Sequence, residues 1–108
     1  MDSEEFQLLN EYIIFCIEKI RDIFIALKSN LDTEKWRTYS PKTSNGVLTV
    51  TFINGILNVL RLLIENNEVS DVENYKDELK DINNFKFKEY KSSQYRKMGE
   101  DIYKKYYK

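Results

Sequence analysis

The stretch that decides the fold runs from Thr49 to Asn66 and reads TVTFINGILNVLRLLIEN. It holds an Asn-Gly pair, Asn54-Gly55, inside an otherwise largely apolar run, and Asn-Gly is a strong signal for the tight turn of a β-hairpin. The segment is therefore either two strands joined by a turn or a single helix that contains a glycine. These alternatives lead to different fold classes, and the pattern of apolar side chains distinguishes them.

The strand alternative fails after the turn, because successive side chains of a strand point to opposite faces and one face should be apolar. Beyond Gly55, one face would carry Ile56, Asn58, Leu60 and Leu62, and the other Leu57, Val59, Arg61 and Leu63. Each face would include a polar residue. The hairpin is therefore the weaker interpretation.

A helix accommodates the same residues better, because its polar side chains then gather within an arc of about 80°. These polar residues are Thr51, Asn54, Asn58, Arg61 and Glu65. We expect one helix over residues 49–66 that is apolar around most of its circumference and therefore central. Gly55 costs such a helix about 1 kcal/mol relative to alanine, unless a neighbouring backbone packs closely against it.

Apolar residues at steps of three and four predict a long first helix over residues 3–28. Asp2, together with Glu5, or Ser3 can cap it, and its acidic first turn suits the helix dipole. Its apolar positions are Phe6, Leu9, Ile13, Cys16 or Ile17, Ile20, Phe24 and Leu27. Residues 29–46 hold the only proline and indicate a connection, with a short helical turn over residues 32–39 that packs Trp36 against the core.

Two shorter helices are predicted in the C-terminal third. Asn66-Asn67 ends the central helix, and Ser70 with Glu73 forms a capping box for the next one. The apolar positions of that helix are Val72, Tyr75, Leu79 and Ile82. Phe85 and Phe87 alternate with lysines, which predicts a short extended piece. Ser92 or Ser93 is expected to cap a last helix with apolar positions Tyr95, Met98, Ile102 and Tyr106. The elements together predict an all-α fold, an irregular four-helix bundle with the apolar helix at its centre.

The composition is that of one globular domain over residues 1–108, either a whole protein or an accessory domain of a larger one. A net charge of −1 provides no global field for nucleic acid or an anionic membrane. The start MDSEEFQ is acidic where a secretory signal would be basic, and no apolar run approaches the roughly 18 residues of a membrane span. We therefore expect a cytoplasmic protein without a membrane partner.

The chain has no histidine, which removes the commonest general base and the usual partner of a nucleophilic serine or cysteine. Its single cysteine, Cys16, lies in the apolar run IIFCI, where an inert buried thiol is expected. The carboxylates of Asp77, Glu78 and Asp81 lie on an otherwise polar helix surface, and we expect this surface to face solvent. The sequence thus predicts a protein that is not an enzyme, without catalytic residues, cofactor, metal site or small-molecule substrate.

Two features remain as candidate binding sites. The stripe Asn54, Asn58 and Arg61 on the central helix can hold a hydrogen-bond network, face a partner or simply meet water. Residues 85–108 carry eight basic and three acidic groups interleaved with tyrosines, a mixture that can contact phosphates or belong to an ordinary terminal helix. The candidate phosphate contacts are Arg96, Lys97, Lys104 and Lys105.

The segments TVTFINGILNVLRLL and YKSSQYRKMGEDIYKKYY together resemble the helical C-terminal region of bacterial proteins that carry a DGQHR domain. The matching positions are Thr49, Thr51, Ile53, Asn54, Gly55, Leu60, Arg61, Leu62, Ser92, Ser93, Gln94 and Tyr95. No D-G-Q-H-R string occurs in the chain, so the domain that names the family is absent. The resemblance implies an accessory domain associated with DNA modification and mobile-element defence.

Three functions are compatible with these observations. The first is a non-catalytic interaction or accessory domain that binds a protein partner or a second copy of itself. The second is a small helical inhibitor or immunity protein acting through its acidic surface around residues 71–81. The third is weak, non-specific nucleic-acid binding through the basic C-terminus.

Overall fold

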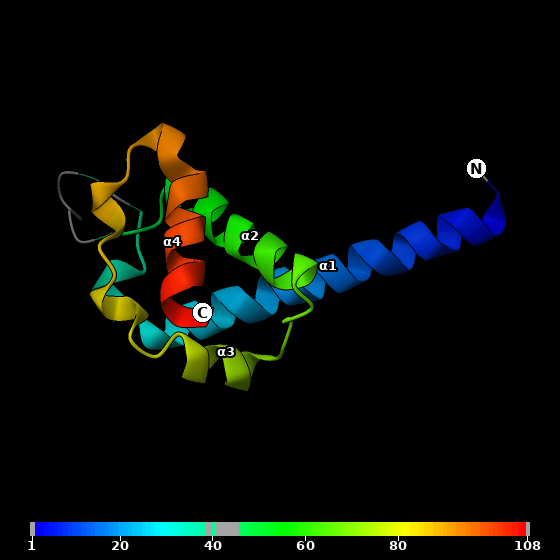
Figure 1. Ribbon diagram of the computed structural model, residues 1–108, viewed down its shortest axis with the longest axis horizontal. Helices are drawn as coiled ribbons and strands as arrows, with labels where there is room; N and C mark the ends of the chain where they lie inside the picture. The colour runs from blue at the N-terminus through cyan, green and yellow to red at the C-terminus, as the bar shows by residue number, and fades with distance from the viewer. Residues whose placement is uncertain (1, 39, 41–45, 108) are drawn as a thin grey trace.

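The computed structural model describes residues 2–38, 40 and 46–107. In these residues the chain forms helices α1 (Ser3–Asn30), α2 (Val50–Glu65), α3 (Val72–Glu78) and α4 (Tyr95–Tyr107), joined by short 3₁₀ turns. The described residues form no β-ladder beyond a single bridge between Thr38 and Leu48. The predicted all-α class is therefore confirmed. The four helices form a bundle at one end of the molecule, and α1 extends far beyond it (Figure 1).

Helix α2 answers the question raised by Asn54-Gly55, because both residues lie inside one continuous helix. The Thr49 hydroxyl caps its first turn by accepting a hydrogen bond from the backbone N–H of Phe52 at 3.0 Å. Asn66 ends it, and Asn67 then adopts a positive φ of 59° that helix interiors exclude. The predicted bounds and the central position are confirmed, since α2 packs along α4 and also contacts α1.

Gly55 and Gly99 allow α2 and α4 to cross at close range. A Cβ atom built on Gly99 would lie 2.7 Å from the carbonyl oxygen of Gly55, and one built on Gly55 would lie 2.6 Å from the sulfur of Met98. The sequence predicted that a glycine inside this helix is destabilising unless a neighbouring backbone packs closely against it. The close packing of α4 against α2 provides this compensation. Gly99 was not foreseen as the matching residue on α4.

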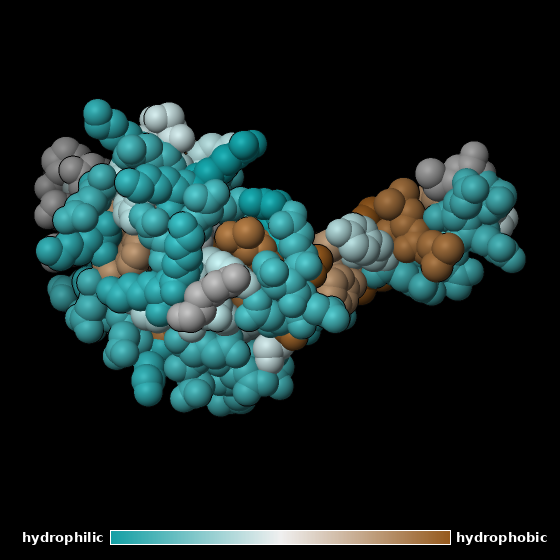
Figure 2. Space-filling view, viewed as in Figure 1, coloured by the Kyte–Doolittle hydropathy of each residue, from teal (hydrophilic) through white to brown (hydrophobic). Residues whose placement is uncertain are grey.

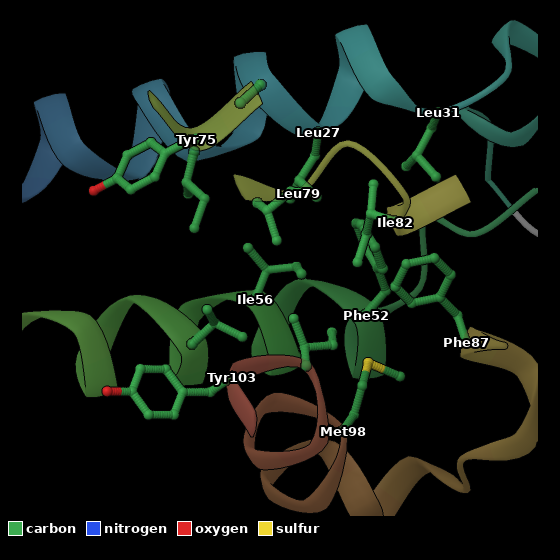
Figure 3. Packing of buried hydrophobic residues seen from close by; sticks show 14 of the residues in the cluster. Leu27, Leu31, Phe52, Ile56, Tyr75, Leu79, Ile82, Phe87, Met98 and Tyr103 are labelled. Carbon is green, nitrogen blue, oxygen red and sulfur yellow. The ribbon is translucent and has the colours of Figure 1, made fainter. Parts of the chain in front are cut away.

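The core is one cluster to which all four helices contribute (Figure 3). Its largest fully buried side chains are Tyr75, Phe52, Ile23, Leu27, Ile56, Leu63, Leu79, Ile82, Met98, Ile102 and Val59. Trp36 packs at its edge, with its ring inclined by 62° to that of Phe24 and by 86° to that of Phe52, at centroid distances of 6.4 and 6.3 Å. The predicted packing role of Trp36 is confirmed, and the turn before it is the 3₁₀ segment Thr33–Lys35. Pro41, part of the predicted connection, lies outside the described residues.

The second half of α1 is fastened to α3 by side-chain hydrogen bonds. The Asn30 amide donates to the backbone carbonyls of Lys76 and Leu79 at 2.9 and 3.0 Å. The Lys19 ammonium donates to the carbonyl of Ser70 at 3.0 Å. The Asp2 cap is as predicted, accepting from the backbone N–H of Glu5 at 2.8 Å. These hydrogen bonds to the region of α3 thus come from residues 19 and 30 of a helix that begins at residue 3.

Several predicted details of the C-terminal third are wrong. Helix α3 is capped by Asp71 rather than Ser70, because the Asp71 carboxylate accepts from the backbone N–H of Asn74 at 2.9 Å. Helix α3 ends at Glu78, short of the predicted Ile82, and of the predicted extended piece only Phe85 is extended, because Phe87–Glu89 forms a 3₁₀ turn that buries Phe87. Ser92 and Ser93 lie in a 3₁₀ turn before α4, where the Gln94 side chain accepts from the backbone N–H of Lys91 at 2.8 Å.

Candidate interaction surfaces

The polar stripe of α2 divides into a structural part and a solvent-facing part. Asn58 is only 8% exposed, and its amide donates to the backbone carbonyl of Arg96 at 3.3 Å. The same side chain accepts from the Nε of Arg61 at 3.1 Å, and Arg61 also pairs with Glu65 at 2.7 Å. Asn58 therefore links α2 to α4, which is the hydrogen-bond network that the sequence left as one alternative. Asn54 is half-buried and Arg61 is exposed.

A shallow hollow of about 620 Å³ opens over this stripe. Its lining residues are Asn54, Leu57, Asn58, Arg61, Tyr95 and Arg96. The Arg61 guanidinium is already paired with Glu65 and hydrogen-bonded to Asn58, so much of its donor capacity is used within the domain. The Arg61 cation is thus largely engaged within the domain, which leaves the exposed Arg96 as the other cation at the hollow.

The four candidate phosphate contacts are all exposed on α4. At 100° per residue, Lys97 and Lys104 lie nearly in line, whereas Arg96 and Lys105 lie about 80° to 100° to either side. The Arg96 guanidinium lies 6.0 Å from the ring of Tyr95, and the Lys105 ammonium lies 5.7 Å from the ring of Tyr106. The cations are thus dispersed over half the circumference of a short helix and do not converge on one point.

Tyrosines and carboxylates form a second cluster where α4 meets α3 and the segment before it. The Tyr103 hydroxyl donates to Glu68, and the rings of Tyr103 and Tyr107 stack at 5.9 Å. Burial raises the pKa of Tyr107, and the neighbouring carboxylate of Glu78 raises it further. Burial also raises the pKa of Glu78. These contacts join secondary elements and leave no accessible nucleophile, so the cluster is structural.

The acidic surface considered for an inhibitor lies on and around α3. Its exposed members are Asp71, Glu73, Asp77 and Asp81. Glu73 lies 3.6 Å from Lys76, an exposed pair of small energetic consequence. Within the described ranges, no three His, Cys, Asp or Glu side chains are grouped so as to hold a metal ion.

The most prominent surface was not foreseen as a surface at all. Eight large apolar side chains on the first half of α1 are between 38% and 65% exposed. They are Phe6, Leu8, Leu9, Tyr12, Ile13, Ile14, Phe15 and Ile17. Figure 2 shows brown, hydrophobic patches between paler and teal atoms along the arm that projects from the body. We call this set the bare arm. Exposed apolar surface of such extent marks a binding site in soluble proteins.

A simple signal in the sequence could have revealed the bare arm. A helix of 28 residues is about 42 Å long. The rest of a small domain cannot cover that length, since the shorter dimensions of the molecule are 27 and 24 Å. The radius of gyration of 15.2 Å likewise exceeds the roughly 13 Å expected for 108 residues in a compact shape.

The bare arm leads into a groove between α1 and the C-terminal half of α2. The groove has a volume of about 360 Å³. Tyr12, Cys16 and Ile20 line it on the α1 side, and the α2 side consists of Leu57, Leu60, Arg61, Ile64 and Glu65. The sequence predicted a buried Cys16, but the side chain is only half-buried in this groove. The apolar surface thus continues from the arm onto the body.

Comparisons of the chain with protein-family models, with curated proteins and with solved structures found no match. The resemblance to DGQHR-domain proteins therefore rests on the sequence motifs alone. Among the helices that the structure describes, none has the length and apolar character needed to cross a membrane.

Proposed function

We propose that this chain is a non-catalytic protein-interaction module that binds its partner through the bare arm of α1. The observation that carries the proposal is the exposure of eight large apolar side chains on residues 6–17, on a helix whose other half is built into the core. An arm that stayed in water would leave this apolar area without the stabilisation that burial gives. The setting we propose, a bacterial accessory domain associated with DNA modification or defence, follows from the DGQHR resemblance.

The arm suits helix-in-groove or helix-pair recognition, in which one helix face supplies anchors at steps of three and four residues. Phe6, Leu9 and Ile13 have this spacing on one face. The arm is also separate from the body, so a partner can bind it without disturbing the core. We rank this surface above the acidic face of α3 and the dispersed cations of α4 because neither of those has a comparable desolvation gain.

Affinity capture with the tagged chain in extracts of its native host tests the proposal. The wild-type chain is compared with I13E, which places a charge on the anchor face, and with I25E. Ile25 is 43% exposed on the same helix but lies outside the bare arm, so I25E is the matched control. We expect protein binding that I13E abolishes and I25E retains. Identical captured proteins for all three chains would show that the arm is not a binding surface.

A further inference from the structure

The apolar residues of α1 form one continuous seam with coiled-coil spacing. Phe6, Leu9, Ile13, Cys16, Ile20, Ile23 and Leu27 are separated alternately by three and four residues. Ile23 and Leu27 at the end of this seam are fully buried, and Ile20 is half-buried. Earlier in the seam, Phe6 is 65% exposed. The seam therefore runs out of the core, and its first three positions, Phe6, Leu9 and Ile13, are exposed.

The charges of the arm oppose a parallel pairing with a copy of itself. Residues 2–18 contain five carboxylates and no lysine or arginine. The first basic residues of the chain are Lys19 and Arg21, and Lys19 already contacts the body through its hydrogen bond to the Ser70 carbonyl. Two parallel arms would place their acidic residues side by side, whereas two antiparallel arms would place each acidic tip beside the basic base of the other.

We infer that the bare arm binds the same arm of a second copy of this chain, with the two α1 helices antiparallel and related by a twofold axis. The inference rests on the proposed function and names its partner. In heptad terms, Phe6 and Ile13 occupy a positions of the seam, and Leu9 and Cys16 occupy d positions. An antiparallel coiled coil places each a position of one helix opposite a d position of the other. Phe6 then faces Cys16 of the second copy, and Leu9 faces Ile13 of the second copy. The twofold axis repeats both contacts, which gives four apolar layers.

The positions that flank the seam are complementary in the same register. Glu5 comes beside Lys19 of the second copy, twice by symmetry, and the two Tyr12 rings meet at the axis. Lys19 lies 3.7 Å from Asp22 and donates to the Ser70 carbonyl, and an ammonium with three donors can also accept a carboxylate partner. A parallel pair in register would instead place Glu5 beside Asn10 and Tyr12 beside Ile17 of the second copy, without an opposite charge.

The groove beside α2 completes the site. Phe6 of the second copy faces Cys16, which lines this groove together with the apolar side chains of Ile20, Leu60 and Ile64. The pairing therefore extends from the arm onto the body and covers the groove. Its overlap of residues 3–19 is about 25 Å long, so we expect a dimer that dissociates on dilution.

Sedimentation velocity of the full chain at about 5 and 500 µM tests the stoichiometry. We expect a monomer mass at the lower concentration and a dimer mass at the higher one. I13E should remain monomeric at both concentrations, and I25E should behave as the wild type does. E5K and K19E should each weaken the dimer and the double variant E5K/K19E should restore it, with melting temperatures confirming that each variant is folded.

Disulfide trapping tests the orientation, because Cys16 is the only cysteine. In F6C under mild oxidation, antiparallel arms should give a dimer linked from residue 6 to residue 16 of the other copy, identified by peptide mass spectrometry. The same pair within one chain is about 15 Å apart along the helix, beyond the roughly 7 Å between Cα atoms that a disulfide spans. The wild type should not form a Cys16–Cys16 link, because Cys16 of one copy faces residue 6 of the other and the two Cys16 residues are therefore also about 15 Å apart along the pair.

Three outcomes overturn the inference: a monomer at about 500 µM, a dimer unaffected by I13E, or a trapped dimer linked through Cys16 to Cys16. The capture experiment separates this failure from failure of the proposed function. A chain that stays monomeric and still captures another protein through a surface sensitive to I13E leaves the interaction module standing and excludes the second copy as its partner.

Discussion

Gly99 shows how a single missing side chain can set the distance between two helices. A Cβ atom at this position would lie 2.7 Å from the Gly55 carbonyl oxygen and 2.8 Å from the Cβ of Asn58. Both neighbours belong to α2, and the backbone oxygen cannot rotate away. Asn58 in turn needs this closeness to reach the carbonyl of Arg96. The buried amide and the glycine are thus parts of one contact.

We therefore expect G99A to lower the free energy of unfolding by roughly 1 to 3 kcal/mol, the usual cost of overpacking. The direction is informative, because the same change in an exposed helix adds about 1 kcal/mol of stability. Urea denaturation measures the difference. G55A is the matched comparison: its new Cβ would lie 2.6 Å from the sulfur of Met98, a side chain that can shift where a backbone oxygen cannot, so we expect a smaller loss of stability than in G99A. A G99A chain as stable as the wild type would contradict the close crossing.

Glu78 predicts a dependence of stability on pH. Burial raises its pKa, and the charges of Glu68, Asp77 and Asp71 raise it further. A pKa that is higher in the folded than in the unfolded state means that folding favours the protonated form. The resulting stabilisation is complete below the pKa of the unfolded chain and is lost as the pH rises through the pKa of the folded chain. At neutral pH the ionised Glu78 is therefore a net cost to the folded state.

E78Q should accordingly melt at a higher temperature than the wild type at pH 7, and the gap should close as the pH falls toward 3.5. Thermal melts followed by circular dichroism at several pH values measure this gap. E73Q serves as the control, since the side chain of Glu73 on the same helix is 83% exposed and its removal should have little effect at any pH. A gap for E78Q that is constant across pH would show that its charge is not the cause.

At the scale of elements, the sequence predicted what depends on local periodicity. Helices α1 and α2 were placed within about two residues, because their apolar spacing, the Asp2 and Thr49 ends and the Asn66-Asn67 stop are all local signals. The cap of α3 was misplaced by one residue because Ser70 and Asp71 are both good caps, and tertiary contacts decide between them. Ser70 instead receives a hydrogen bond from Asn74 on its hydroxyl.

What covers an apolar face is not a local property, and this explains why the candidate site was missed. The apolar spacing of α1 is the same around Ile13 as around Ile23, yet the Ile13 side chain is 46% exposed and the Ile23 side chain is fully buried. Only the placement of α2, α3 and α4 around one end of the helix separates the two cases. By contrast, the exposure of the α4 cations followed directly from the apolar positions Met98 and Ile102, which are buried.

At the scale of the whole molecule, the charge distribution argues for weak binding of nucleic acid. Residues 85–108 carry a net charge of +5, which leaves −6 on the remainder. The approach of α4 to a phosphate backbone also brings the acidic body closer, and Glu100 and Asp101 interrupt the basic residues on α4 itself. Tyr90 further ties Asp101 into the domain with a hydrogen bond of 2.6 Å.

The last prediction is therefore that any DNA or RNA binding is electrostatic, non-specific and no tighter than roughly 10⁻⁵ M near physiological salt. Contacts from Arg96, Lys97, Lys104 and Lys105 to four phosphates would weaken binding about 100-fold between 50 and 200 mM salt. The double variant K97E/K104E removes the two aligned cations and should reduce this factor to about tenfold or abolish binding. Fluorescence anisotropy with duplex and single-stranded probes measures both quantities. I14E, whose change lies on α1, controls for general effects of added negative charge. Tight binding that resists salt or selects a sequence would mean that α4, and not the bare arm, is the principal binding surface of the molecule.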